Sequence, residues 1–248
     1  LIGTDFHLHS ELSTDSRHRV DEALRMIAAE GLELVASTDH DYLTDYADVA
    51  AGAGVAAWLV TVTGEEVSST VYGHLGGYPL ARDAALAGGG AVVWLDANVL
   101  DAIAGIRARG DAALGGALVQ INHPRLRGGG FFDYLALDEA GAATADAFAL
   151  GLPAGTDLDA FDADVVEVWN GYTRGDNEAS FADWLALCAR GRCLTMVGNS
   201  DSHRPDLPAG SPRTFLGVPD DTRGAYGWTE AGAALRVLMP FGFLSFEY

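Results

Sequence analysis

The chain has 248 residues, of which 49% are hydrophobic, and this is enough material for the core of one α/β domain. No apolar run reaches the roughly 18 residues that a membrane-spanning helix needs, so no membrane partner is expected. The formal net charge is −20, from 35 acidic and 15 basic residues, and such an acidic surface repels nucleic acid, whose phosphates are bound by Lys and Arg.

Short apolar runs alternate with amphipathic stretches along the first half of the chain. The apolar runs predict strands at residues 1–8, 32–38, 58–64 and 71–78, the last as a further strand or a hairpin partner. The amphipathic stretches predict helices at residues 19–30, 46–53 and 96–109. The run at residues 91–95 fits either a strand or a helix.

The second half continues the alternation after a long interruption. Strands are predicted at residues 117–122, 164–170 and 193–200, and helices at 176–190 and 229–238. Strands regularly followed by helices imply parallel pairing through right-handed crossovers, which predicts one α/β domain over residues 1–248, built as a TIM-like barrel. The interruption at residues 125–164 contains three consecutive glycines and is predicted as a lid or insert loop.

The sequence leaves the compartment and the oligomeric state open. It begins at Leu1 without a methionine, so an excised domain or a processed product is expected, and both a cytoplasmic and an exported protein fit. Cys188 and Cys193 are either core thiols or a disulfide, and they do not decide the compartment.

Six of the seven histidines gather at or near predicted strand ends, namely His7, His9, His40, His74, His123 and His203. In a parallel barrel the carboxyl ends of the strands form one face, where the active sites of such barrels are built. The seventh, His18, lies at a helix start and is predicted to be exposed to solvent.

Three acids accompany these histidines, namely Asp15, Glu65 and Asp201. His7 and His9 are two apart on a strand, so their imidazoles project from the same side, and Asp201 and His203 repeat that spacing. Imidazole combined with carboxylate is the ligand set of Zn²⁺, Mn²⁺ or Fe²⁺. One such pair is weak evidence, but the joint pattern predicts two or three divalent ions. The chain has no lysine, which excludes Schiff-base chemistry and a carbamylated-lysine bridge.

The same residues carry a resemblance to the polymerase and histidinol phosphatase (PHP) family of metal-dependent hydrolases. The matching segments are DFHLHS (5–10) with Asp15, STDH (37–40), GEE (64–66), His74, NHP (122–124) and NSDSH (199–203). Further segments resemble the carbaryl hydrolase (CehA/McbA) branch, namely YGHLGGYPL (72–80), QINHPR (120–125), VVEVWNG (165–171), GNSDSH (198–203) and SPRTF (211–215). The resemblance covers residues 1 to about 220, and residues 237–248 match nothing in the family.

The resemblance implies a distorted seven-stranded (β/α) barrel and up to three metal positions. The first would be held by His7, His9 and Asp201, with Glu65 shared. The second would be held by Glu65, His74 and His123. The third would be held by Asp15, His40 and His203, and it varies within the family, so two or three ions are expected.

This centre predicts hydrolysis of a small anionic or ester substrate through a metal-bridging hydroxide, with Glu65 as the catalytic bridge. A phosphoesterase acting on a phosphate mono- or diester is the leading function. Arg125 and Arg213 are candidate catalytic residues that would bind phosphate oxygens, with plain surface arginines as the alternative. Asp39 and Asn122 are expected to orient ligand histidines, and Glu167 either supports a ligand or reaches a metal.

Two other functions stay open at this point. The same centre would serve a carboxylic-ester or carbamate hydrolase, with an aryl pocket built from Phe131, Phe132, Tyr134, Trp169 or Tyr172. A non-catalytic metal-binding or regulatory PHP module is the alternative of another class. A serine hydrolase is disfavoured, because Ser10 and Ser200 lack a histidine that is free of metal.

Overall fold

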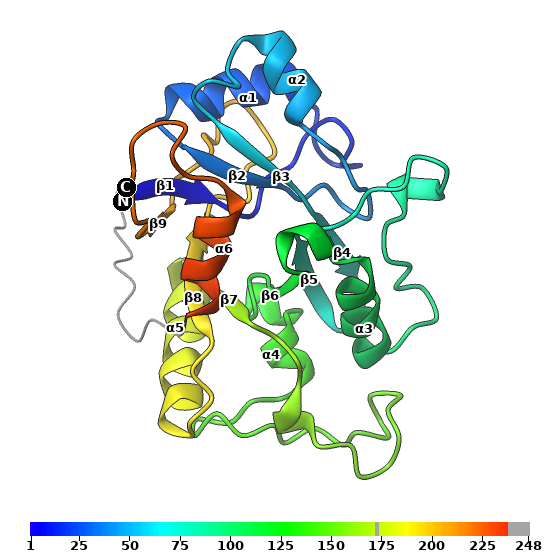
Figure 1. Ribbon diagram of the computed structural model, residues 1–248. Helices are drawn as coiled ribbons and strands as arrows, with labels where there is room; N and C mark the ends of the chain where they lie inside the picture. The colour runs from blue at the N-terminus through cyan, green and yellow to red at the C-terminus, as the bar shows by residue number, and fades with distance from the viewer. Residues whose placement is uncertain (172–173, 238–248) are drawn as a thin grey trace.

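The computed structural model describes residues 1–171 and 174–237, and its strands form two mixed sheets (Figure 1). The first sheet has the order β3-β2-β1-β9, with the strands β1 (Ile2–Asp5), β2 (Leu34–Ser37), β3 (Val60–Thr63) and β9 (Thr214–Leu216). Its first three strands are parallel, and β9 pairs antiparallel with β1.

The second sheet has the order β4-β5-β6-β7-β8. Its strands are β4 (Glu65–Ser69), β5 (Gly73–Tyr78), β6 (Leu118–Ile121), β7 (Val165–Asn170) and β8 (Thr195–Asn199). The pairs β4–β5 and β5–β6 are antiparallel, whereas β6–β7 and β7–β8 are parallel. Residues 172–173 and 238–248, which include Tyr172 and most of the C-terminal stretch, lie outside the described residues.

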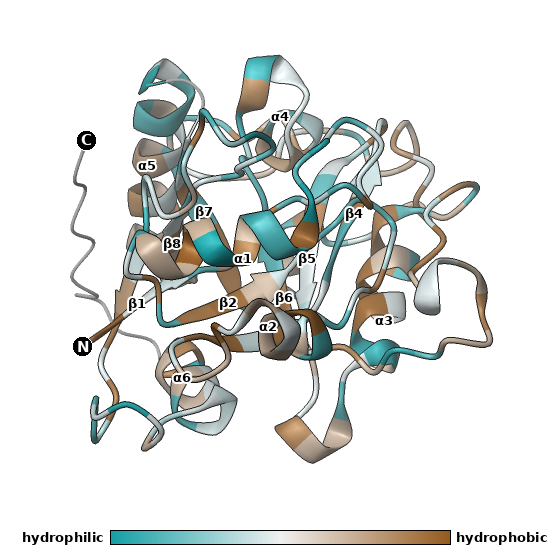
Figure 2. Cartoon of the chain, turned by 90° about the horizontal axis from the view of Figure 1, so that it is seen from above, coloured by the Kyte–Doolittle hydropathy of each residue, from teal (hydrophilic) through white to brown (hydrophobic). Residues whose placement is uncertain are grey.

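Six α-helices are described, namely α1 (Val20–Ala29), α2 (Ala47–Ala53), α3 (Val99–Arg109), α4 (Phe131–Tyr134), α5 (Arg174–Ala189) and α6 (Trp228–Arg236). Helix α1 is amphipathic, and its residues at positions i, i+3, i+4 and i+7 are buried, namely Val20, Ala23, Leu24 and Ile27. Figure 2 shows the same division by colour, with α1 alternating between teal and brown above the brown strands. Each helix in the described part of the chain is too short or too polar to cross a lipid bilayer.

The α/β class predicted from the sequence is confirmed, but the described strands do not close into one continuous ring. Two single bridges join the sheets instead, one between Leu8 and Ser202 and one between His40 and Glu66. Leu8, His40 and Ser202 lie just beyond strand ends, and Glu66 lies at the start of β4. The junction of the two sheets is therefore also the place where the predicted ligands gather.

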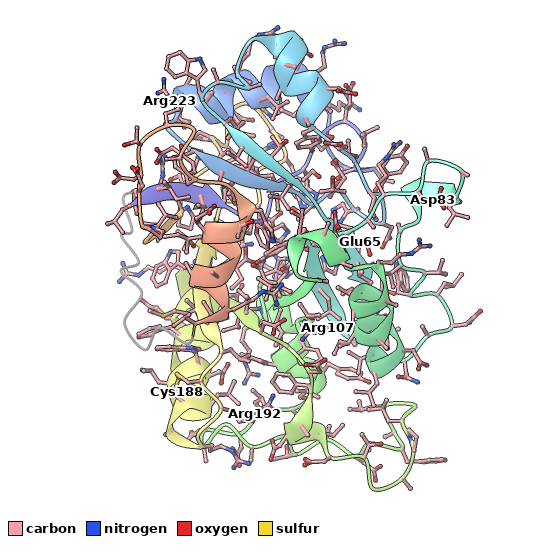
Figure 3. All side chains as sticks on the ribbon, viewed as in Figure 1. Glu65, Asp83, Arg107, Cys188, Arg192 and Arg223 are labelled. Carbon is pink, nitrogen blue, oxygen red and sulfur yellow. A yellow bond between two sulfur atoms is a disulfide. The ribbon has the colours of Figure 1, made fainter. Side chains whose placement is uncertain are left out.

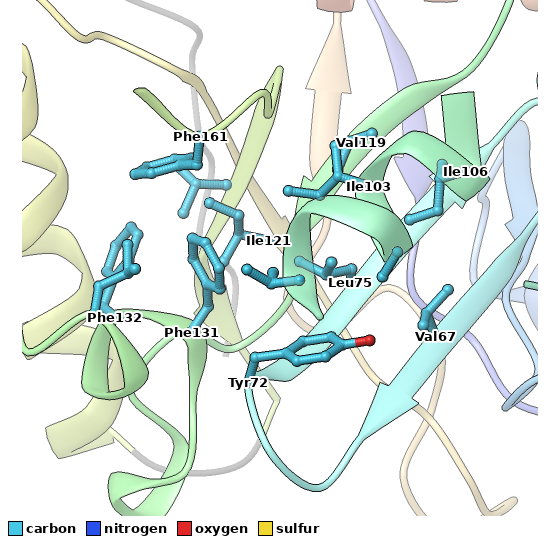
Figure 4. Packing of buried hydrophobic residues seen from close by; sticks show 14 of the residues in the cluster. Val67, Tyr72, Leu75, Ile103, Ile106, Val119, Ile121, Phe131, Phe132 and Phe161 are labelled. Carbon is cyan, nitrogen blue, oxygen red and sulfur yellow. The ribbon is translucent and has the colours of Figure 1, made fainter. Parts of the chain in front are cut away.

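The largest hydrophobic cluster packs between the second sheet and helices α3 and α4 (Figure 4). The segment 125–164 contributes Phe131, Phe132 and Phe161 to this cluster, all of them buried. Apart from its first residues, that segment is thus anchored to the core by apolar side chains. The prediction that Phe131 and Phe132 line an aryl pocket is wrong, because both rings are fully buried in the hydrophobic core.

Two local predictions are resolved by the structure. Cys188 and Cys193 form a disulfide at the end of α5 (Figure 3). His18 is only 3% exposed, so the prediction of a solvent-exposed side chain is wrong. The backbone N–H of Glu11 donates to the carbonyl of His18, and this contact folds the loop before α1 back against the domain.

Candidate metal centre

The residues of the centre come from strand ends of both sheets. His7 and His9 follow β1 and His40 follows β2, whereas His123 follows β6 and Asp201 follows β8. Four sets of three ligand atoms lie within 4.8 Å of one another: His9, His40 and His203; His7, His9 and Glu66; His7, His123 and Asp201; and His40, Glu66 and His74. The structure thus brings together all six histidines that the sequence singled out.

Glu66 occupies the middle of this cluster, and its carboxylate is fully buried. Its oxygens lie near the ring nitrogens of five histidines, at 2.9 Å from His7, 2.9 Å from His40, 3.1 Å from His74, 3.3 Å from His123 and 3.6 Å from His9. Together with these imidazoles, the Glu66 carboxylate would be able to hold divalent cations.

The role predicted for Glu65 is wrong, because this residue of β4 belongs to none of the four ligand sets and does not line the cavity of the centre. Successive residues of a strand face opposite ways, so only one of two adjacent glutamates can face the histidines. Both Glu65 oxygens accept from the backbone N–H of Val92, each at 3.1 Å. Burial raises the pKa of Glu65 to about 8, which the Val92 N–H partly offsets.

Asp201 is the second buried carboxylate of the centre. Its Oδ1 lies 3.1 Å from His9 Nε2, 3.3 Å from His7 Nε2 and 3.3 Å from His203 Nδ1. Asp201 has a φ of +51° and His123 a φ of +25°, a region that residues other than glycine rarely adopt. Such backbone conformations concentrate at functional sites, where the surrounding structure compensates their cost.

Asp15, His40 and His203 form the outer part of the centre. Asp15 lies 3.3 Å from His40 Nε2 and 3.3 Å from His203 Nε2, and its side chain is 57% exposed. The rings of His9 and His203 stack with their centroids 3.9 Å apart, which connects this outer group to the buried one.

Glu167 holds His7 from behind. Its Oε1 lies 2.9 Å from His7 Nδ1, which leaves Nε2 of His7 directed at Glu66 and Asp201. The same carboxylate accepts from the backbone N–H of His123 at 2.7 Å and from the amide of Asn199 at 3.1 Å. A carboxylate on the far nitrogen of a ligand histidine fixes its tautomer and orientation.

Asp39 lies behind a ligand histidine, as the sequence predicts, whereas Asn122 binds a ligand carboxylate. Asp39 accepts from the hydroxyl of Ser13 at 2.9 Å, and that hydroxyl lies 3.0 Å from His9 Nδ1. The amide of Asn122 donates to Glu66 Oε1 at 2.8 Å. Ser13 was not predicted from the sequence, because a serine in a loop gives no signal that distinguishes it from its neighbours.

Carboxylates and histidines shift one another's pKa in this centre. Burial alone would raise the pKa of Glu66, but His7 and the other imidazoles hold it well below its usual value. Burial lowers the pKa of His9 to about 4, although Asp201 opposes this. For His40, burial is outweighed by the Glu66 carboxylate 2.9 Å away, and the pKa rises to about 9. Without metal, protons on some histidines thus balance the buried carboxylates.

The donor set fits divalent ions with nitrogen and oxygen ligands. Among the described residues, four buried polar atoms of the centre make no hydrogen bond of acceptable geometry, namely His9 Nε2, Glu66 Oε2, His74 Nδ1 and His123 Nδ1. Buried polar atoms without partners are rare, because their desolvation is costly. His9 Nε2, Glu66 Oε2 and His74 Nδ1 face other donors of the centre, which fits a role as metal ligands, whereas His123 faces Glu66 with Nε2.

A cavity of about 230 Å³ opens onto the centre. It is lined by Asp15, His40, Glu66, His74, His123, Asp201 and His203, together with Leu126 and Arg127. Arg125 and Arg213, which the sequence predicts to bind substrate, are not among these residues. Arg127, which the sequence does not single out, lines the cavity instead.

Both predicted arginines have structural partners instead. Arg125 binds Asp183 at 2.6 Å and Asp133 at 3.0 Å, which ties α4 to α5. Arg213 donates to the carbonyl oxygens of Gly210 at 2.7 Å and Glu30 at 2.8 Å. The substrate-binding roles predicted for Arg125 and Arg213 are therefore wrong.

No protein family model matches this chain, and no curated protein matches it in sequence. Among solved structures it is similar to a two-domain protein from Bacteroides vulgatus that contains a predicted PHP-like metal-dependent phosphoesterase, with a TM-score of 0.57 and 18% identity. That match covers 96% of this chain and 63% of the neighbour, so the chain spans less than two thirds of the neighbour's length. At this identity the likeness shows a shared fold.

Two further neighbours match less closely. One is an amidohydrolase from Chromobacterium violaceum with bound sulfate and no metal, with a TM-score of 0.48, 19% identity and coverage of 86% of this chain and 92% of that one. The other is a candidate metal-dependent phosphoesterase from Bifidobacterium adolescentis, with a TM-score of 0.44, 17% identity and coverage of 84% and 90%.

Proposed function

We propose that this chain is a metal-dependent hydrolase of the PHP type that cleaves a small phosphate ester. The observation that carries the proposal is Glu66, a buried carboxylate within 3.6 Å of ring nitrogens of five histidines at the floor of an open cavity. The Bacteroides vulgatus neighbour, whose fold the chain shares over 96% of its length, contains a predicted PHP-like phosphoesterase, which supports the same class.

The chain's own residues hold and orient the centre. When bound, two or three divalent ions would supply Lewis acidity and an activated water for attack on phosphorus. Glu167 keeps Nε2 of His7 directed inward, and Asn122 orients Glu66. In the overall reaction one water is consumed, the ester P–O bond breaks, and the alcohol leaves with a proton as phosphate is released.

Charge favours an anionic substrate once ions are present. The centre contains three carboxylates, namely Asp15, Glu66 and Asp201. Two divalent ions would leave about one positive charge in excess, and three would leave about three. A phosphate group would neutralise that excess inside the cavity.

The cavity lining gives no support to the aryl carbamate alternative. Leu126 is the only apolar side chain that lines the cavity among the described residues. The hydroxyl of Tyr134 donates to the carbonyl of Leu150, and Trp169 does not line the cavity either. Tyr172 lies outside the described residues.

Two finer assignments belong to the same proposal. The two sheets, bridged at Leu8–Ser202 and at His40–Glu66, would correspond to a distorted and interrupted barrel of the PHP type. Asp15, His40 and His203 would hold a third ion, which would exchange faster than the buried pair because Asp15 is 57% exposed. Zn²⁺, Mn²⁺ and Fe²⁺ all fit this set of nitrogen and oxygen donors.

A side-by-side assay tests the proposed function. Protein loaded with Zn²⁺ or Mn²⁺ would be assayed with p-nitrophenyl phosphate, bis-p-nitrophenyl phosphate and a naphthyl carbamate, before and after dialysis against EDTA. We expect phosphate ester hydrolysis that EDTA abolishes and added metal restores. Turnover of the carbamate alone, or full phosphatase activity after dialysis, would rule out the proposal.

A further inference from the structure

Arg127 is the one arginine that lines the cavity above the metal centre among the described residues. It lies four residues after His123, in the short 3₁₀ turn Leu126–Gly128 that follows β6. Its side chain is exposed and makes no hydrogen bond or ion pair within the described residues, although its backbone N–H lies 3.4 Å from an Asp176 oxygen.

Among the described residues, the guanidinium of Arg127 has neither a carboxylate nor a carbonyl partner, although the protein has a net charge of −20. Several arginines are held by carboxylates, for example Arg107 by Asp162 and Asp164, and others by backbone carbonyls, as Arg213 is. Arg127 instead faces the same cavity as the metal ligands. Bound metal ions would neutralise the carboxylates that line this cavity. The positive charge of Arg127 would then remain available to a ligand.

The backbone around Arg127 is held in place from both sides. On one side the His123 N–H donates to Glu167 and the Leu126 N–H to the His123 carbonyl. Arg127 itself has a φ of +50°, which costs energy for a residue other than glycine. On the other side Gly130 packs directly against the Pro124 carbonyl, where no side chain would fit. The turn therefore presents Arg127 at a defined position over the centre.

We propose that Arg127 binds the non-bridging oxygens of an anionic substrate and gives this site its preference for a phosphate monoester. The inference rests on the proposed function, and it narrows the substrate class. A guanidinium offers two parallel N–H donors that match two phosphate oxygens. A monoester carries up to two negative charges, a diester carries one and a carbamate carries none, so the contribution of Arg127 decreases in that order.

The test compares Arg127→Gln and Arg127→Lys with the wild type and with Arg25→Gln as the matched control. Arg25 forms an exposed ion pair with Asp21 on α1, so its substitution removes the same charge at a distant surface. Binding of inorganic phosphate to the metal-loaded proteins would be measured by calorimetry, together with kcat/KM for the monoester, the diester and the carbamate. Metal content would be determined for every variant.

We expect Arg127→Gln to weaken phosphate binding and monoester kcat/KM by about 10- to 100-fold, the size of a lost charge-assisted hydrogen bond. The diester should lose less, Arg127→Lys should fall in between, and Arg25→Gln should match the wild type. Unchanged phosphate binding in Arg127→Gln, or an equal loss for charged and neutral substrates, would overturn the inference. If the wild type hydrolysed only the carbamate, the proposed function would fail, and the phosphate-binding comparison would still decide the role of Arg127.

Discussion

Two adjacent glutamates provide a matched pair of residues for testing the centre. Glu66 faces the histidines, whereas Glu65 faces the Val92 N–H on the other side of the same strand. We expect Glu66→Gln to lose bound metal and to lower activity by at least about 100-fold, because an amide is neutral and a poor bridge between cations. Elemental analysis and kcat/KM would measure both effects.

Glu65→Gln is the control for that experiment. The pKa of Glu65 is raised to about 8, so its carboxyl group is mostly neutral at pH 7, and glutamine preserves both the shape and an acceptor for Val92. Its metal content and activity should remain close to wild type. Loss of metal in Glu65→Gln with retention in Glu66→Gln would reverse the assignment made here.

Glu167 is expected to act on the metal through His7. The Glu167 carboxylate accepts hydrogen bonds from His123 and Asn199 and contacts His7. In Glu167→Gln one of its two acceptor oxygens is replaced by an NH₂ donor, so His7 loses its fixed orientation. Supporting residues of this kind typically change metal affinity by about 10- to 100-fold. Chelator competition would measure the dissociation constant, with Glu178→Gln on the exposed face of α5 as control. An affinity equal to wild type would show that His7 needs no such support.

The sequence indicates which histidines converge but not which way each neighbouring side chain points. His7, His9, His40, His123 and His203 are predictable because strand ends of a parallel sheet share one edge. The choice between Glu65 and Glu66 depends on strand register, and a shift of one residue reverses it. Which arginine faces the cavity depends on the conformation of the turn after β6. Turns have no hydrophobic periodicity, so the sequence pattern does not reveal that conformation.

At the level of elements, β4 and β9 are the strands that escape prediction. The sequence of β4, EEVSS, places two carboxylates side by side and lacks the apolar alternation that predicts a strand. Its glutamates are nevertheless buried, because one faces the metal centre and the other accepts from a backbone N–H. β9 has three residues and pairs antiparallel with β1, a contact that no local pattern encodes.

The turn that carries Arg127 makes a prediction at this scale. A Cβ at Gly130 would collide with the backbone of Pro124 and Arg125, whereas a Cβ at Gly129 would meet nothing closer than 3.7 Å. Gly130→Ala should therefore lower the free energy of unfolding by about 1–3 kcal/mol and displace Arg127. Gly129→Ala should be nearly neutral. Urea denaturation and phosphate binding would measure the two effects, and equal behaviour of the two variants would contradict this account of the turn.

The stability of the whole molecule should depend on metal binding, because the ligands of the centre come from both sheets. β1 and β2 position His7, His9 and His40, and the second sheet supplies Glu66 and His123, so a bound ion would tie the two sheets together. Ligand that binds only the folded state raises its stability by an amount that grows with the ratio of ligand concentration to Kd. Removal of metal by EDTA should therefore lower the Tm of this protein.

The size of that Tm difference should depend on pH, with a sign that the histidines determine. In the metal-free centre burial lowers the pKa of His40, but the Glu66 carboxylate 2.9 Å away outweighs burial and raises it to about 9, so this ligand would hold a proton at pH 7 that a metal ion must displace. Metal affinity should thus increase as pH rises from 6 to 9, and the Tm difference between loaded and chelated protein should widen over the same range. Calorimetry in two buffers of different ionisation enthalpy would measure the protons released at pH 7. A Tm difference that becomes smaller as pH rises, or metal binding without proton release, would mean that metal ions do not displace protons from the histidines of the centre.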